Sequence, residues 1–253
     1  MKHFVKILFI VLLLVVSTDN LFAQSKQTIP FPKVGLDIGT ADTPEDVSTT
    51  LQILLLMTVL SLAPSILIMT TSYLRIIIVF HFLKTALGTQ SMPPSQLLAG
   101  IALFITFFIM SPTFSKINDD ALRPLMNNEI KIEEAMDKGI QPLREFMLHN
   151  VRDEDIALFV EMAAIDMPAT RVELPTYILL PAFAISELRA GFIIGFFIFI
   201  PFLMVDMIIA SILLSMGMMM IPPMMISLPF KILLFILIDG WSLIIGSVIR
   251  SFG

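Results

Sequence analysis

The sequence predicts an all-α membrane protein, built from apolar helical hairpins with one polar helical insert between them. Of the 253 residues, 57% are hydrophobic and 15% are charged, and the mean hydropathy is +0.91. Soluble domains carry about a quarter charged residues, so this composition is typical of a membrane protein. The charge is also concentrated, because residues 116–173 hold 7 of the 16 Lys and Arg and 13 of the 21 Asp and Glu.

The bulk charge and the absence of cysteine exclude two classes of function. A net charge of −5 argues against nucleic acid as a partner, because phosphate binding needs a basic face. With no cysteine in the chain, disulfides and thiol chemistry are excluded.

The first segment, residues 1–23, has the pattern of a cleaved signal peptide. Lys2 and Lys6 form a basic start, ten apolar residues follow from Ile7 to Val16, and Leu21-Phe22-Ala23 is a cleavage site. That apolar core is too short to cross a bilayer, which takes about 20 residues. An uncleaved anchor is the alternative. Cleavage predicts a bacterial inner-membrane protein whose mature N-terminus is periplasmic.

Residues 24–46 then form an extracytoplasmic linker with prolines, glycines and no apolar period, and residues 47–114 form a first apolar helical pair. In this pair, Val47–Tyr73 is free of charge and long enough to cross the membrane, with a kink expected at Pro64. Leu97–Phe114 is the second apolar segment.

Three basic residues between these two segments predict the orientation of the chain. Arg75, His81 and Lys84 follow the first segment and no acid balances them, so the positive-inside rule places them in the cytoplasm. The second segment then returns the chain outward, and the acidic helical insert, residues 115–173, is extracytoplasmic.

The insert is expected to hold two amphipathic helices. One opens at Pro142 after a helix that stops at Gly139, and the next has Asp153 or Asp155 as its N-cap. Its acidic surface has two interpretations, a solvated face or a docking surface for partner subunits.

Residues 174–253 are predicted to form further apolar hairpins. Thr176–Met220 is almost unbroken apolar sequence, and as one helix it would be about 68 Å long. That is roughly twice the thickness of a hydrocarbon core, so a turn is expected at Pro201. Ser227–Val248 is the last apolar segment.

Five charges lie inside these apolar segments: Glu187, Arg189, Asp206, Lys231 and Asp239. A lone charge at the bilayer centre costs on the order of 3 kcal/mol, so most are expected to be buried against protein. Glu187 and Arg189 are two residues apart and point to different sides of a helix, so they do not pair. The sequence favours Glu187 with Lys231 as a charge pair. Beside them, Gly191-x-x-x-Gly195 predicts close packing against another helix.

The stretch Met216 to Pro223 is predicted to be a gate loop. Its prolines are expected to stop the helix, and irregular backbone at membrane depth is tolerated where it is buried in protein or lines a cavity. Uncharged, flexible methionines can close a hole against ions and still yield to a large passenger, whereas an ion filter uses carbonyls or charges. The expected gate residues are Met216, Met218, Met219, Met220, Pro222 and Pro223.

Other readings of the same residues predict different functions. A copper path would use methionine sulfur, but no cysteine, histidine or second methionine cluster completes a ligand set. Plain core packing by methionine does not explain the prolines. A proton- or ion-coupled transporter using Glu187 and Asp206 is the alternative function. The sequence contains no GxxxxGK, no HExxH and no catalytic set, so no enzyme, metal or cofactor is expected.

Two long stretches, Pro181 to Phe196 and Pro201 to Met220, closely resemble the signatures of the FliP family of type III export-gate proteins, with the flagellar branch favoured by the signal peptide. The resemblance implies a helical cone of several copies, a pentamer, together with FliQ-type and FliR-type subunits at the flagellar basal body. FlhA-type and FlhB-type components and exported flagellar proteins are the further partners implied, besides membrane lipid. It also implies that the methionine loop constricts an export channel, that Glu187 and Lys231 form the buried pair between subunits, and that catalysis belongs elsewhere.

Overall fold

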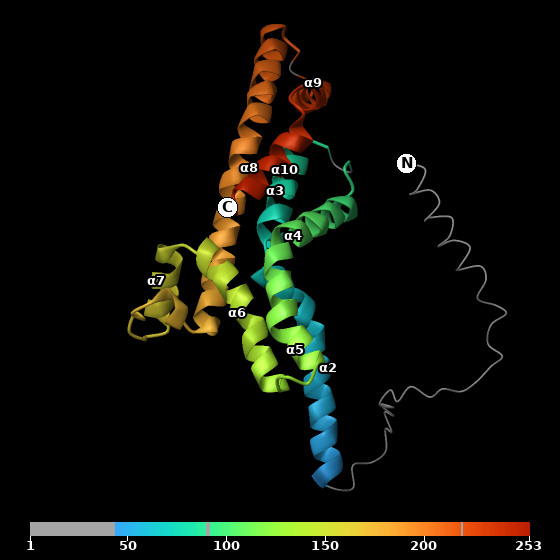
Figure 1. The fold of residues 1–253 in the computed structure, drawn as a ribbon. Helices are drawn as coiled ribbons and strands as arrows, with labels where there is room; N and C mark the ends of the chain where they lie inside the picture. Colours follow the sequence, from blue (N-terminus) through green and yellow to red (C-terminus); the bar gives the residue numbers. More distant parts are fainter. Residues whose placement is uncertain (1–43, 90–91, 219) are drawn as a thin grey trace, which may run out of the picture. The chain divides into compact units, whose positions relative to one another are not determined.

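The computed structural model describes residues 44–89, 92–218 and 220–253, and within them the chain is helical with no strand (Figure 1). The predicted signal peptide and residues 24–43 of the predicted linker lie outside the described residues. The chain divides into two units, Met1–Gln52 and Ile53–Gly253. All packing reported below is within the second unit.

Three helices cover the region predicted as one apolar pair. Helix α2 spans Pro44–Thr70, α3 spans Tyr73–Ala86 and α4 spans Ser95–Ile117. Helix α2 therefore begins inside the predicted linker and continues through Pro64. The predicted crossing segment is α2, and α3 is a separate helix that begins where that segment was expected to end.

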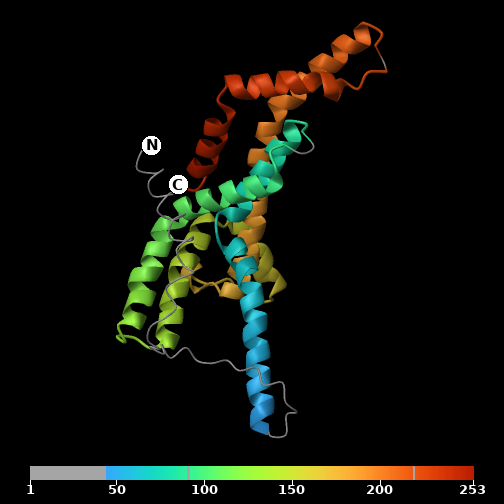
Figure 2. The ribbon, with the colours of Figure 1, turned by 90° about the vertical axis from the view of Figure 1, so that its right-hand side faces the viewer.

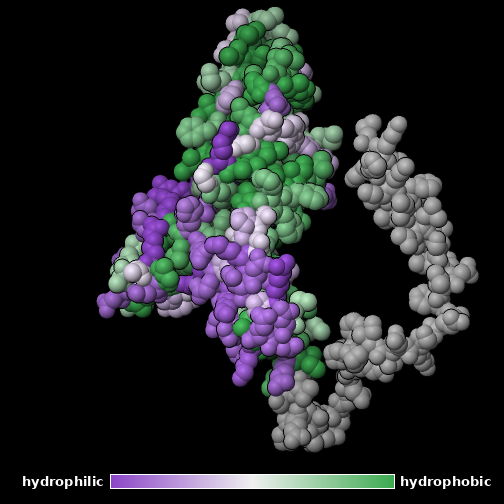
Figure 3. Space-filling model, viewed as in Figure 1, coloured by the Kyte–Doolittle hydropathy of each residue, from purple (hydrophilic) through white to green (hydrophobic). Residues whose placement is uncertain are grey.

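The insert holds more helix than its sequence predicts. A π-helical turn, η2 (Asn118–Leu122), and α5 (Arg123–Met126) extend α4. Helix α6 (Ile132–Asn150) and α7 (Asp153–Met162) follow, and a short turn, η3 (Arg171–Glu173), precedes the C-terminal half. Hydrophilic surface gathers over these helices, whereas the end of the molecule that carries α9 is hydrophobic (Figure 3).

The expectation of a helix stop at Gly139 and a new start at Pro142 is wrong. Both residues lie inside α6, and Pro142 is buried. A proline inside a helix removes one backbone hydrogen bond and its ring crowds the carbonyl four residues earlier, but α6 packs against α4, η2 and α8, which offsets this cost. The start of the next helix is close to its expected place, because α7 begins at Asp153 with three acids in its first turn, which complement the helix dipole.

The expected turn at Pro201 is also wrong, because α8 runs unbroken from Thr176 to Ser215 and contains both Pro181 and Pro201. Its 40 residues span about 60 Å. Apolar helices of this kind tolerate proline where neighbouring helices support them, and α3 and α9 both pack on α8. The chain turns instead after Ser215, and α9 (Pro223–Leu237) leads back to α10 (Gly240–Arg250) (Figure 2).

Helix α3 lies at the centre of the larger hydrophobic core. Ile76, Val79, Phe80 and Leu83 of this helix are fully buried. They belong to one cluster with side chains from α4, α8, α9 and α10. A second cluster joins α6 and α7 to the first turns of α8, so α8 contributes to both.

Three helical stretches are long and apolar enough to cross a membrane: Leu51–Thr70, Ser95–Met126 and Thr176–Ser215. A fourth is formed if α9 and α10, which meet at 64°, count as one broken span. The expected class of an all-α protein with membrane-type helices is therefore confirmed for the described residues.

Candidate functional site

The first buried ion pair joins Arg75 in the first turn of α3 to Glu187 of α8, 112 positions away in sequence. Their side chains are 5% and 0% exposed. The guanidinium binds both carboxylate oxygens: Nε donates to Oε2 at 2.9 Å and Nη2 donates to Oε1. This two-point geometry is the strong form of an arginine–carboxylate pair.

The second ion pair joins Lys231 of α9 to Asp206 of α8, with 2.5 Å between Nζ and Oδ2. Lys231 is almost fully buried and also donates to the carbonyl of Ala86, the last residue of α3, at 3.1 Å. Ser227 donates to the other oxygen of Asp206. The last carbonyls of a helix lack intrahelical partners and carry partial negative charge, so Ala86 is a good acceptor for an ammonium group. The ammonium of Lys231 therefore binds the Asp206 carboxylate and the Ala86 carbonyl together.

The Lys231 contacts give a testable prediction. Lys231→Met is expected to destabilise the chain by about 1–3 kcal/mol, because Asp206 loses its cation and Ala86 its hydrogen bond. Thermal unfolding of the full chain in detergent measures this. Arg250→Met, at an exposed position on α10, is the matched control and should change little. A Lys231→Met chain that unfolds at the parent temperature would contradict the prediction.

The predicted pairing of Glu187 with Lys231 is not the pairing within the chain. Glu187 and Asp206 are 19 residues apart on one helix, which places them about 28 Å apart along α8. Each acid therefore pairs with a different base. Glu187 binds Arg75 at the start of α3, and Asp206 binds Lys231 of α9. A Glu187–Lys231 contact between two copies stays a prediction. The sequence groups Arg75 with His81 and Lys84 as positive-inside residues and does not predict its burial. In the structure Arg75 is buried and neutralised by Glu187, so only His81 and Lys84 remain to support that orientation.

Arg189 and Asp239, expected among the buried charges, are exposed in the single chain, and Asp206 is half-buried. Arg189 follows Glu187 by two residues, and this rotates it by about 200° around α8, away from α3. Asp239 lies in the break between α9 and α10, where its backbone is left-handed with φ 47°.

Gly191 and Gly195 lie on the buried face of α8 that meets α3. A Cβ added at Gly195 would lie 2.5 Å from the ring of Phe82, and one at Gly191 would lie 3.0 Å from Ile78. The missing side chains therefore set how closely the two helices approach, and this approach brings Arg75 within reach of Glu187.

The methionine-rich loop, residues 216–222, begins with a Schellman motif. Gly217 has φ 73°, its N–H donates to Leu214 O, and the N–H of Met218 donates to Leu213 O. Gly217 rather than the prolines therefore stops α8, which corrects the expected cause. Pro223 is the first residue of α9, where a missing N–H costs nothing.

Three of the loop methionines are described by the structure, and all three are exposed in the single chain. Met216, Met218 and Met220 are 67%, 39% and 97% exposed, and Pro222 is exposed as well. Met219 lies outside the described residues. The sulfurs that the structure describes are thus available to something other than the chain's own core.

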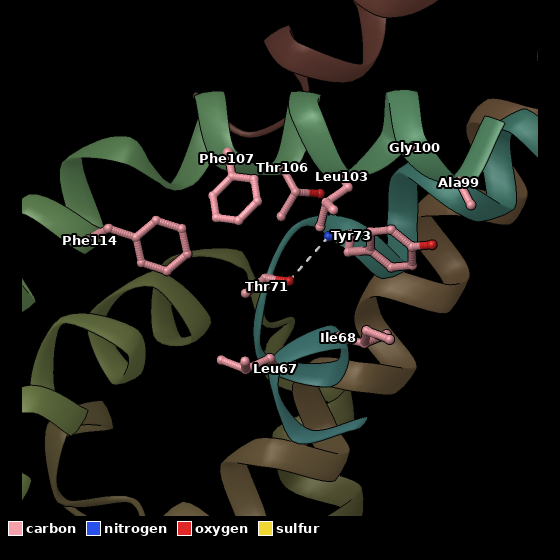
Figure 4. A pocket seen from close by; sticks show the side chains of 10 residues that line it. All are labelled: Leu67, Ile68, Thr71, Tyr73, Ala99, Gly100, Leu103, Thr106, Phe107 and Phe114. Atoms are coloured by element: carbon pink, nitrogen blue, oxygen red, sulfur yellow. Dashed lines mark hydrogen bonds between the residues drawn. The ribbon is translucent and has the colours of Figure 1, made fainter. Parts of the chain in front are cut away.

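A cavity of about 380 Å³ lies between the end of α2, the start of α3 and one side of α4 (Figure 4). Leu67 and Ile68 face Leu103 and Phe107 across it, and Tyr73 N donates to Thr71 Oγ1 at its wall. Its lining carries no charged side chain, so the cavity fits apolar groups.

The carboxylates proposed for ion coupling are both engaged by bases, Glu187 by Arg75 and Asp206 by Lys231. No group of three His, Cys, Asp or Glu suited to a metal ion occurs in the part of the chain that the structure describes. The two ion pairs therefore hold α3, α8 and α9 together, and the methionine-rich loop is exposed at the end of α8.

Comparison with known proteins places this architecture in a family. The FliP family matches residues 56–248. The flagellar biosynthetic protein FliP of Bacillus subtilis (strain 168) is 56% identical over 217 residues, which cover 86% of this chain and 98% of the relative. The protein of that name from Caulobacter vibrioides is 48% identical over 87% of this chain and 82% of its own length. The one from Borreliella burgdorferi is 44% identical over 93% of this chain and 94% of its own. The chain therefore belongs to the FliP family.

Proposed function

We propose that this chain is a core subunit of the flagellar protein export gate in the bacterial inner membrane. Several copies, five in the proposed assembly, surround a channel through which unfolded flagellar subunits cross the inner membrane. FliQ-type and FliR-type subunits complete the gate, and FlhA-type and FlhB-type export components are its further partners. Its relatives' name as flagellar biosynthetic proteins and its membrane-type helices support the proposal.

The observation that carries the channel role is the exposed methionine loop at the far end of α8. From Met207 to Phe230 the chain contains no ionisable residue, so a ring of these loops would not select cargo by charge. Thioether side chains are unbranched, flexible and polarizable. Copies of the loop brought together would close a pore against ions and part around a polypeptide.

Two further features support an assembly of copies. Helix α2 carries exposed apolar side chains along its described length. Arg189 and Asp239 are exposed charges on apolar segments, where a charge facing lipid is costly. In the proposed gate, neighbouring copies or partner subunits cover them.

The loop gives a direct test in cells that contain the whole export apparatus. Replacing Met216, Met218 and Met220 by alanine is expected to raise the leak of small ions severalfold, because each substitution removes three heavy atoms from the seal. A membrane-potential dye measures the leak, and secretion of flagellar subunits measures export.

The matched control is Met126, Met136 and Met162→Ala, three methionines of the insert that are 80%, 61% and 72% exposed. This control should leave the leak at the parent level. An equal leak in the loop variant, the control and the parent would refute the constriction.

A further inference from the structure

Ser251 and Phe252, which follow α10, both contact the buried guanidinium of Arg75. Arg75 Nη1 donates to the carbonyl of Ser251 at 2.6 Å and to its Oγ at 2.9 Å. The ring of Phe252 lies 3.7 Å below the same guanidinium. The contacts with Ser251 and Phe252 add to the two bonds with Glu187, so Arg75 binds α8 and the end of α10 together.

Phe252 also reaches the insert. Its ring is stacked on Phe146 of α6, with 6.0 Å between centroids and 23° between planes. Phe146 in turn meets Phe183 of α8 edge-on at 5.9 Å. Phe252 is therefore sandwiched between a buried cation and an aromatic ring, and cation–π contacts are strongest where water is excluded.

These contacts fasten α9 and α10, here called the arm (residues 223–250), at both of its ends. Lys231 near the start of the arm binds the carbonyl of Ala86 at the end of α3. Ser251 and Phe252 just beyond the arm bind Arg75 at the start of α3. Between the two attachments, Ile244 and Val248 are buried in the α3 cluster. The arm connects directly to the methionine loop.

The charge of Arg75 is already balanced by Glu187, so the contacts with Ser251 and Phe252 do not serve neutralisation. They use the one guanidinium nitrogen that Glu187 leaves free. These bonds are partly buried, and loss of Ser251 would remove both acceptors that the structure shows for that nitrogen. The contacts therefore determine where the end of the arm lies.

We propose that Ser251 and Phe252 form a latch that holds the arm on α3 and ties it to α6 of the insert, and thereby fixes the methionine loop. The effect of the latch on the methionine loop rests on the proposed function. The latch itself is a property of the chain and is measured separately from the gate.

A cysteine probe tests the latch directly, because the chain has no cysteine of its own. Val248→Cys places a thiol of similar size at a fully buried position of α10, one turn before Phe252. In the full chain within its membrane, the rate of labelling by a small maleimide reports release of the arm. Adding Phe252→Ala is expected to raise this rate about tenfold, as loss of a cation–π contact with a buried guanidinium predicts.

Three controls accompany the probe. Phe252→Tyr keeps the ring and should keep the slow rate. Phe104→Ala removes a phenylalanine ring of α4 that is 78% exposed, and it should also keep the slow labelling rate. Where Phe252→Ala does not accumulate, Phe252→Leu replaces it, since it keeps apolar contact and removes only the ring. A labelling rate unchanged by loss of the ring overturns the latch.

The ion-leak assay separates the latch from the gate. A rise in leak in Phe252→Ala, alongside faster labelling, supports the coupling of latch and loop. Faster labelling without a rise in leak overturns that coupling. If the loop variant itself gives no leak, the proposed gate fails, while the labelling result still decides whether the latch exists.

Discussion

Arg75→Gln is expected to prevent the folded chain from accumulating in the membrane. The substitution leaves Glu187, which is fully buried, as an uncompensated charge, and breaking a buried pair in this way costs about 3–5 kcal/mol. A domain's whole stability is about 5–15 kcal/mol, so a loss of this size is decisive. Steady-state level and resistance to limited proteolysis in isolated membranes are the measurements.

Two further variants isolate the cause of that loss. Arg75→Gln with Glu187→Gln removes both charges and should recover part of the level, because two neutral amides can hydrogen-bond where one charge cannot be solvated. Arg123→Gln removes an exposed arginine of α5 and should match the parent. If the single Arg75 variant accumulates normally, the buried pair does not stabilise the fold.

Gly195→Ala is expected to have the second large effect, a destabilisation of about 1–3 kcal/mol from overpacking. The added methyl would lie 2.5 Å from Cγ and 2.8 Å from Cβ of Phe82. These atoms are near the backbone of α3, so the ring cannot simply swing aside and the helices must separate. Separation also lengthens the Arg75–Glu187 contacts. Thermal unfolding in detergent gives the size of the effect.

Gly100→Ala provides the comparison in the same protein. Gly100 is also inside a helix, but a Cβ there meets nothing within 4 Å. Alanine is the better helix former by about 1 kcal/mol, so Gly100→Ala should raise the unfolding temperature. Opposite signs for the two substitutions are expected, and a gain at both positions would show that α3 and α8 are not closely packed at Gly195.

Composition and local pattern predict the helices well and their breaks poorly. The apolar segments and the polar insert follow from hydropathy, and most helices lie where it places them. Pro142 and Pro201 predict breaks that do not occur, because packing of α6 and α8 against neighbouring helices offsets the cost of a proline inside each helix. Gly217 had a stronger effect, since glycine enters the left-handed conformation without steric penalty.

The charge partners could not be predicted from the sequence at all. Arg75 and Glu187 are 112 positions apart, and no local spacing relates them. Arg75 stands in a run of basic residues that the positive-inside rule assigns to an aqueous face, so its burial has no sequence signal. Lys231 was identified as buried, but its acceptor at Ala86 is a backbone carbonyl, which carries no residue-specific pattern.

The Schellman turn at Gly217 and the proline start of α9 have a consequence for how this protein can change over time. Both ends of the connection are specified by main-chain geometry, so the side chains between them are not needed to shape it. Substitutions at Met218 or Met220 would then alter the surface that the loop presents, which lines the channel in the proposed gate, without unfolding the subunit. If the proposed gate is correct, selection can therefore change the side chains that line its channel while the helices around them stay the same.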